Sequence, residues 1–471
     1  MTLRSLKYLT VGLLVAVLSM SAALAQNSKA ESLNEKALEF LRQQNYDKAV
    51  STLTEAIKAS PKYADSYFNI GFAYYCMSRY DDAMQWYRKT IQIDSSYADA
   101  YVNIGLVYNH KKQFKESIEW CRRALSIDST LANAYTNMGV AYGGLGQNNE
   151  AIKCYLSSLN LDSTSAITYN NLGNAYNNIG QYNRGISYLS RAVAIQPEYA
   201  SAYYSMGLAY AKLDMPDDAI QCYKKAVEIE PRLITVYNDM GNVYAAMHDY
   251  DKAIECFRTS VNKAPKYVDA YHNLGMLYYE RKKFDSAAVW FKRATLIDPD
   301  HAQSYYACGI AYYMNGDRKE ALNWYLKAIE HNPRHALAYN SLGYVYQEQK
   351  DYTKAIECYK KAIDASPRYI DAYNNLGALY IHLKRYSDAV ECYSSAVTAD
   401  SKRPESYYNL GVAYYLSGDK SRAVTELEKA VSLRSNYTDA YHNLSVIYDE
   451  LGQPEKAKAC RDKAENSDNT F

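Results

Sequence analysis

A glycine recurs every 34 residues along most of this chain, and this spacing restricts the fold more than any other feature. It occupies positions 71, 105, 139, 173, 207, 241, 275, 309, 343, 377 and 411. The next step in the series lands on Ser445, and the step before the series lands on Ala37. If this residue is numbered as position 8, thirteen repeats run from Ala30 to Phe471 without insertion or deletion. A fixed period of this length predicts a repeat solenoid, in which each unit packs against its neighbours.

The pattern inside each repeat predicts two helices. Positions 4 and 11 are Tyr in the second to thirteenth repeats, from Tyr67 and Tyr74 onwards. Positions 4, 7, 8 and 11 form one stripe of a first helix, and positions 20, 24 and 27 form one stripe of a second. Small residues at positions 8 and 20 allow the two backbones to approach, and Pro at position 32 in seven repeats ends the second helix. Two helices cannot bury both stripes alone, so stability depends on stacking.

These residues resemble the tetratricopeptide repeat family over residues 30–471. The resemblance implies an all-α fold, an α-solenoid in which tandem helix-turn-helix units wind into a right-handed superhelix. The chain departs from the family in having Tyr where Trp is frequent at position 4, which keeps a large ring. The first repeat (30–63) and the last (438–471) are more polar, because Lys36 and Arg461 replace core residues. We interpret these two repeats as caps of a complete array.

The first 25 residues differ from the rest of the chain. Arg4 and Lys7 precede an apolar run, and small residues end at Ala25, as is typical of a secretory signal peptide. We expect cleavage after Ala25, a short segment at 26–29, and an exported protein of a bacterial periplasm or secreted space; an uncleaved anchor is the alternative. Without 1–25 the chain has 51 basic and 52 acidic side chains and no further apolar run that could span a membrane. This balance argues against nucleic-acid binding.

The cysteines and histidines do not form a catalytic or metal-binding pattern. Six of the nine cysteines and all four tryptophans occupy position 23, which indicates a packing site. Equivalent residues of adjacent repeats should lie at least ~8–10 Å apart, too far for a disulfide, whose Cα atoms lie within roughly 7 Å. The sequence contains no C-x-x-C, H-E-x-x-H or phosphate-binding glycine loop. We therefore expect no cofactor, no metal and no enzyme activity.

Asparagine is frequent at position 6, on the part of the first helix that lies off the core stripe. The resemblance implies that first helices line a concave groove, and it is closest to the array of O-GlcNAc transferase, whose asparagine ladder holds the backbone of an extended peptide. No transferase domain follows in this chain. The predicted peptide-binding residues are Asn69, Asn103, Asn137, Asn171, Asn273, Asn375, Asn409 and Asn443, with Asn174 beside them at position 9. An amide carries a donor and an acceptor, so it can bind peptide groups without reading side chains. In the alternative, these residues are repeat background that bonds to a neighbouring helix.

Positions 5 and 12 are both aromatic in three repeats. The pairs are Phe68 with Tyr75, Tyr306 with Tyr313, and Tyr408 with Tyr415. Each pair shares one side of its helix and suits stacking on sugars or proline rings, whereas packing between repeats is the alternative interpretation. The sequence thus favours an exported scaffold that binds a protein or peptide partner in its groove. A cell-envelope glycan-binding protein and a purely structural spacer remain as alternatives, and the oligomeric state is not predicted.

Overall fold

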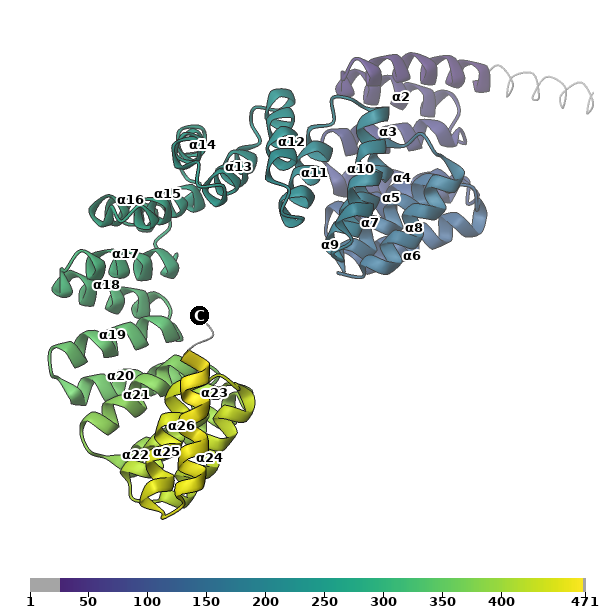
Figure 1. The fold of residues 1–471 in the computed structure, drawn as a ribbon. Coiled ribbons are helices and arrows are strands. Elements are labelled where there is room, and N and C mark those ends of the chain that lie inside the picture. Colours follow the sequence, from purple (N-terminus) through teal and green to yellow (C-terminus); the bar gives the residue numbers. More distant parts are fainter. Residues whose placement is uncertain (1–25, 469–471) are drawn as a thin grey trace, which may run out of the picture. The chain divides into compact units, whose positions relative to one another are not determined.

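The computed structural model describes residues 26–468 and contains successive helical hairpins throughout that range (Figure 1). No strand occurs among these residues, which confirms the predicted all-α solenoid. Residues 26–42 are helical, so residues 26–29, expected to form a separate segment, continue directly into the first helix of the array. The predicted signal peptide, residues 1–25, lies outside the described residues.

Each repeat places its first helix at positions 1–13 and its second at positions 17–30. The first helices after residues 26–42 are α3 (Ala64–Cys76), α5 (Ala98–His110), α7 (Ala132–Gly144), α9 (Ala166–Asn178), α11 (Ala200–Lys212), α13 (Ile234–Ala246), α15 (Val268–Glu280), α17 (Ala302–Met314), α19 (Ala336–Glu348), α21 (Ile370–His382), α23 (Pro404–Leu416) and α25 (Thr438–Glu450). The second helices are α2 (Tyr46–Ala59), α4 (Tyr80–Ile93), α6 (Phe114–Ile127), α8 (Asn148–Leu161), α10 (Tyr182–Ile195), α12 (Pro216–Ile229), α14 (Tyr250–Lys263), α16 (Phe284–Ile297), α18 (Arg318–His331), α20 (Tyr352–Ala365), α22 (Tyr386–Ala399), α24 (Lys420–Leu433) and α26 (Pro454–Asp468).

The turn inside each repeat contains one residue in the left-handed backbone conformation. In the second repeat this residue is Ser78, with φ of 60°, and Gly occupies the same site in other repeats, for example Gly146 at 74°. The backbone N–H of Arg79 then donates to the carbonyl of Tyr74 at 2.9 Å, which closes the end of α3. A left-handed residue at this site therefore reverses the chain sharply enough for the second helix to pack on the first.

The core of each repeat is built where position 8 meets position 24. A Cβ added to Gly71 would lie 2.6 Å from the ring of Tyr87, and one added to Gly377 would lie 2.4 Å from the ring of Tyr393. Both tyrosines are buried. The glycine is needed because the aromatic ring lies directly on the backbone of the first helix. The predicted close approach of the two helices is thus confirmed.

The chain divides into two compact units between Val243 and Tyr244, inside α13. Consecutive first helices contact one another within each unit: α5, α7, α9 and α11 in the first, and α15 with α17 and α19 through α25 in the second. Consecutive second helices do not do so to the same extent anywhere in the described chain. The first helices therefore lie on the inner side of the curvature within each unit, and we call their exposed surface the first-helix face. None of the described helices combines the length and apolarity of a membrane span.

Candidate functional site

The predicted peptide-binding asparagines lie between neighbouring first helices. Asn137 is buried, whereas the others are half-buried: Asn69, Asn103, Asn171, Asn174, Asn273, Asn375, Asn409 and Asn443. The sequence suggested a solvated row, but the adjacent first helix covers part of each amide. These residues are therefore placed to contact both the preceding repeat and a molecule on the first-helix face.

Four of these asparagines donate a hydrogen bond to the preceding repeat. The bonds run from Asn69 Nδ2 to Asn34 Oδ1 at 2.9 Å, from Asn375 Nδ2 to Asn340 Oδ1 at 2.9 Å, from Asn409 Nδ2 to Asn374 Oδ1 at 3.1 Å, and from Asn443 Nδ2 to the Tyr408 hydroxyl at 3.2 Å. Each joins position 6 of one repeat to position 5 of the repeat before it, 35 residues earlier. We call such a bond a rung, and the four rungs match the alternative in which asparagine bonds to a neighbouring helix.

Other residue types form the same contact. The Tyr204 hydroxyl donates to Asp239 Oδ2 at 2.7 Å, and the hydroxyls of Tyr306 and Ser341 lie 3.5 Å apart. Both pairs again join position 5 to position 6 across 35 residues. The rung is therefore a property of the repeat geometry, and a suitable pair of polar side chains is enough to form it.

A rung leaves part of each carboxamide unused. A carboxamide has two N–H donors and an oxygen with two acceptor sites, and a rung takes only one N–H of the position 6 residue. No hydrogen bond to the Oδ1 atoms of Asn69, Asn375, Asn409 or Asn443 occurs within residues 26–468. None of these oxygens is a buried atom without a partner, so solvent reaches them. Each rung thus presents an oriented, accessible acceptor.

The asparagines of the third to fifth repeats do not form regular rungs. Asn137 Nδ2 lies 3.4 Å from the carbonyl of Val102, and the Asn137 carbonyl accepts from Asn109 Nδ2 at 2.9 Å. Asn171 Oδ1 accepts only from the adjacent Asn170, at 3.4 Å. The preceding position 5 residues are Phe68, Val102 and Thr136 instead of Asn. A row that looks uniform in sequence is therefore divided into two kinds of site.

The aromatic pairs make contacts with the following repeat. Phe68 packs against Tyr97 with ring centroids 5.1 Å apart, and Tyr408 packs against Tyr437 at the same distance. Tyr306 lies 4.9 Å from the ring of His335. These contacts match the alternative of packing between repeats.

The position 12 tyrosines use their hydroxyls in the same direction. Tyr313 donates to Glu348 Oε1 and Tyr415 donates to Glu450 Oε1, both at 2.8 Å, and Tyr75 lies 2.6 Å from His110 Nε2. A carboxylate acceptor raises the pKa of the Tyr415 hydroxyl, because it stabilises the protonated phenol. None of these tyrosines therefore presents an unused hydroxyl to a ligand.

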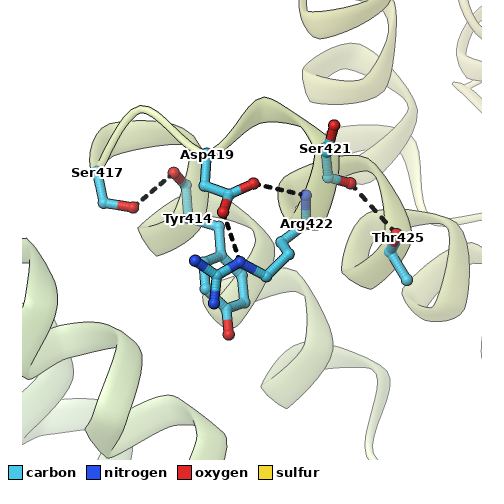
Figure 2. A network of polar contacts seen from close by, with 6 residues as sticks. All are labelled: Tyr414, Ser417, Asp419, Ser421, Arg422 and Thr425. Atoms are coloured by element: carbon cyan, nitrogen blue, oxygen red, sulfur yellow. Dashed lines mark hydrogen bonds and ion pairs between the residues drawn. The ribbon is translucent and has the colours of Figure 1, made fainter.

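The turn between the helices carries a polar cluster that the sequence reasoning missed. Figure 2 shows Asp419, which precedes α24 and accepts from the Arg422 backbone N–H at 2.9 Å, while the Arg422 guanidinium lies over the Tyr414 ring at 4.6 Å. Elsewhere the charges are exchanged: Arg385 lies 4.7 Å from the Tyr380 ring and pairs with Asp388. An oppositely charged pair at positions 16 and 19 is the sequence signal for this cluster. It explains why position 11 keeps an electron-rich ring.

The second helices carry the position 23 residues. Trp86 lies 5.9 Å from Tyr67 and Trp290 lies 6.1 Å from Tyr271, ring centroid to centroid, which confirms that position 23 is a packing site. The nine cysteines are free thiols, and burial raises the pKa of Cys222 and Cys358 to about 11. Such thiols are weak nucleophiles at neutral pH. The described residues contain no group of three His, Cys, Asp or Glu arranged to hold a metal.

Family models match the chain over most of its length. One model described as tetratricopeptide repeat matches residues 96–163, 232–298, 269–334, 334–402 and 368–436. Four further models with the same description match residues 200–233, 34–98, 154–186 and 438–470. No curated protein matches the chain.

Several solved structures are similar to parts or all of the chain. MamA is 32% identical over 35% of this chain and 95% of its own length, with a TM-score of 0.33. YrrB, described as a TPR protein with an unusual peptide-binding site, is 24% identical over 40% of this chain and 98% of its own, with a TM-score of 0.34. Yeast Tom70 is 15% identical over 93% of this chain and 97% of its own, with a TM-score of 0.42.

Proposed function

The chain belongs to the tetratricopeptide repeat family, whose fold serves protein–protein interaction, and we propose that it is a scaffold whose first-helix face binds an extended segment of another protein. The observation that carries this proposal is the rung. Asn375, Asn409 and Asn443 are fixed by the preceding repeat, and each keeps its Oδ1 atom accessible. A row of oriented acceptors, one in each repeat, suits the N–H groups of a peptide backbone.

The spacing of packed helices supports an extended ligand. Neighbouring helices lie about 8–10 Å apart, and an extended chain advances about 10 Å in three residues. One rung in each repeat can therefore meet the backbone of every third ligand residue. Because the amide is already held by its rung, little side-chain entropy remains to be lost on binding.

The two alternatives have weaker support. A glycan-binding face needs aromatic rings that lie free at the surface, but Phe68, Tyr306 and Tyr408 pack on the following repeat. A purely structural spacer explains the rungs but gives no use to their accessible oxygens. We also propose that the chain is a non-catalytic scaffold, as tetratricopeptide repeat scaffolds generally are.

We further propose that the protein is exported to a bacterial periplasm or secreted space and that residues 1–25 are removed. The support is the charged, apolar and small-residue pattern that ends at Ala25. An intact-mass measurement on the exported protein should give a chain that starts at Gln26. A mass that includes Met1 would contradict cleavage and favour an anchor.

Peptide selection tests the binding proposal. A library of random twelve-residue peptides is selected on the full chain, on the variant Asn375→Ala/Asn409→Ala/Asn443→Ala, and on the control Ser394→Ala/Ser395→Ala/Thr398→Ala. The control removes three polar side chains from the second helix α22. We expect peptides that bind the wild type and the control but not the asparagine variant. Equal recovery on all three proteins, or recovery of no peptide by the wild type, would contradict the proposal.

A further inference from the structure

A small cavity of about 50 Å³ lies on the first-helix face between α23 and α25. It is lined by Val412, Tyr415, Leu427, Asn443, Val446 and Ile447. Three of these are aliphatic residues of the first helices, and Asn443 is the rung residue that reaches back to Tyr408. The cavity therefore lies directly beside an acceptor of the proposed peptide site.

The cavity exists because position 24 of this repeat is Leu427. Eight repeats have Tyr or Phe at position 24. The far end of that ring extends toward positions 12 and 6 of the first helices, as when the Tyr359 hydroxyl donates to Gln347 Oε1 at 3.0 Å. Leucine is too short to reach there, so the space that a phenol ring fills elsewhere is left open.

Two other repeats with a small residue at position 24 close this space with an asparagine. Beside Cys121, Asn109 Nδ2 donates to the carbonyl of Asn137 at 2.9 Å. Beside Leu189, Asn177 Nδ2 donates to the carbonyl of Ser205 at 3.3 Å. Both asparagines occupy position 12, where the repeat of Leu427 has Tyr415. The Tyr415 hydroxyl is instead bonded to Glu450, which leaves the cavity without such a cover.

The charges around the cavity are one-sided. Helices α23 and α25 contain four carboxylates and neither Lys nor Arg. Three of the carboxylates pair with cations of other segments: Glu405 with Arg434, Asp449 with Arg461, and Glu450 with Lys420. Asp439 has no ion pair among the described residues, and it precedes Asn443 by one helical turn. A ligand group beside Asn443 is therefore favoured by a positive charge.

We propose that this cavity holds a branched aliphatic side chain, Val, Ile or Leu, of an extended partner segment that carries a Lys or Arg next to it. The Asn443 Oδ1 atom accepts a backbone N–H of the same segment, the aliphatic side chain fills the space between Val412, Val446 and Ile447, and the cation approaches Asp439. The inference rests on the proposed peptide-binding function and adds selectivity at one repeat. The rungs hold any backbone, whereas the cavity reads one side chain.

The test uses defined peptides on the full chain. The probe is a fluorescein-labelled dodecapeptide of three Ser-Lys-Val-Ser units, with comparison peptides in which Ala replaces Val or Glu replaces Lys. Fluorescence anisotropy should show the Val peptide binding about 15-fold more tightly than the Ala peptide, because two further carbon atoms are buried. The Glu peptide should bind more weakly than the Lys peptide, since its charge repels Asp439.

Filling the cavity should abolish this selectivity. Leu427→Tyr restores the residue of most other repeats, and Gly411 supplies the same room that Gly71 gives Tyr87. The Val-to-Ala ratio should fall to about 1 while the melting temperature holds. Tyr415→Asn, which copies the cover of the third and fifth repeats, should lower the ratio in the same way. Tyr393→Leu is the opposite control: it opens the equivalent space beside Asn409 and should keep the ratio at or above the wild-type value.

The outcomes separate the cavity from the binding face. A Leu427→Tyr protein that folds and keeps the wild-type Val-to-Ala ratio overturns the cavity inference, even if Asn375→Ala/Asn409→Ala/Asn443→Ala weakens every peptide. Equal binding of the Val and Ala peptides by the wild type overturns it as well. If the asparagine variant binds all peptides as the wild type does, the proposed function fails, whatever the cavity reads.

Discussion

The second to fifth repeats and the eleventh to thirteenth repeats both have asparagine at every position 6, yet their structures differ. In the later group, Asn375, Asn409 and Asn443 all form rungs. In the earlier group only Asn69 does, and Asn137 and Asn171 make longer contacts. The residue that decides is at position 5 of the preceding repeat, which is Asn or Tyr for the rungs and Phe, Val or Thr otherwise.

The comparison shows that a repeat position gains its role from a residue 35 places earlier. Asn340 and Asn374 supply an amide oxygen at rung distance, whereas Phe68 packs on Tyr97 and supplies none. An asparagine with a rung is fixed and presents its oxygen to the first-helix face. We therefore expect the eleventh to thirteenth repeats to bind a backbone better than the third to fifth.

The largest expected effect concerns position 5 where position 6 has no polar side chain. His272 is followed by Ala307, and its Nδ1 instead lies 2.9 Å from Ser304 Oγ, which His301 Nδ1 also contacts at 2.7 Å. Burial, together with the neighbouring His301, lowers the His272 pKa to about 4, although Asp269 opposes the shift. As pH falls below about 6.5 the unfolded chain takes up a proton that the folded chain refuses, so stability is lost between about pH 6.5 and 4.

Lowering the pH from 7 to 4.5 should therefore cost the wild type on the order of 2–3 kcal/mol at this site. The variant His272→Asn, which copies position 5 of other repeats, should lose less over the same range. Urea unfolding at both pH values measures the difference. An equal loss in the two proteins would contradict the buried neutral histidine.

A smaller effect separates the two kinds of asparagine. Asn409→Ala removes a rung, and we expect the free energy of unfolding to fall by about 0.5–1.5 kcal/mol. Asn171→Ala removes a weak local contact, so improved helix propensity should leave stability unchanged or raise it by up to about 0.7 kcal/mol. Thermal unfolding of the two single variants, side by side, gives the sign of each change. A loss for Asn171→Ala equal to that for Asn409→Ala would contradict the division of the row.

The smallest expected effect isolates the rung itself. The double-mutant cycle of Asn374→Ala and Asn409→Ala should show a coupling of about 0.5–1 kcal/mol, because each amide loses its partner in the other's variant. The matched cycle of Thr136→Ala and Asn171→Ala, at the same two positions, should show coupling near zero. Equal couplings in both cycles would remove the basis for distinguishing the two regions.

The sequence predicted the fold closely because its signals repeat thirteen times. Tyr67 and its equivalents, the glycine at position 8 and the residues at position 23 each gave the same indication in many registers, and packing followed from them. The first-helix face was predicted less well. Whether Asn171 or Asn409 forms a rung depends on a pair of residues in different repeats, and a single register read position by position does not contain that pairing.

The cavity beside Asn443 depends on a still wider set of residues. Leu427 opens it, Tyr415 leaves it uncovered, and the wall includes residues of the following repeat. A short residue at position 24 was visible in the sequence, but its consequence changes with position 12, since Asn177 closes the corresponding space beside Leu189. Such combinations become apparent only when neighbouring helices are placed together.

The central claim is that rung amides hold a ligand backbone, and peptide binding by Asn375→Ala/Asn409→Ala/Asn443→Ala tests it most directly. Each lost bond to the peptide is worth about 0.5–1.5 kcal/mol, so the three together should weaken the labelled Ser-Lys-Val-Ser dodecapeptide by roughly 10-fold to 1,000-fold. Anisotropy is measured on protein whose helicity equals that of the wild type by circular dichroism. A folded variant that binds the peptide with wild-type affinity would contradict the account.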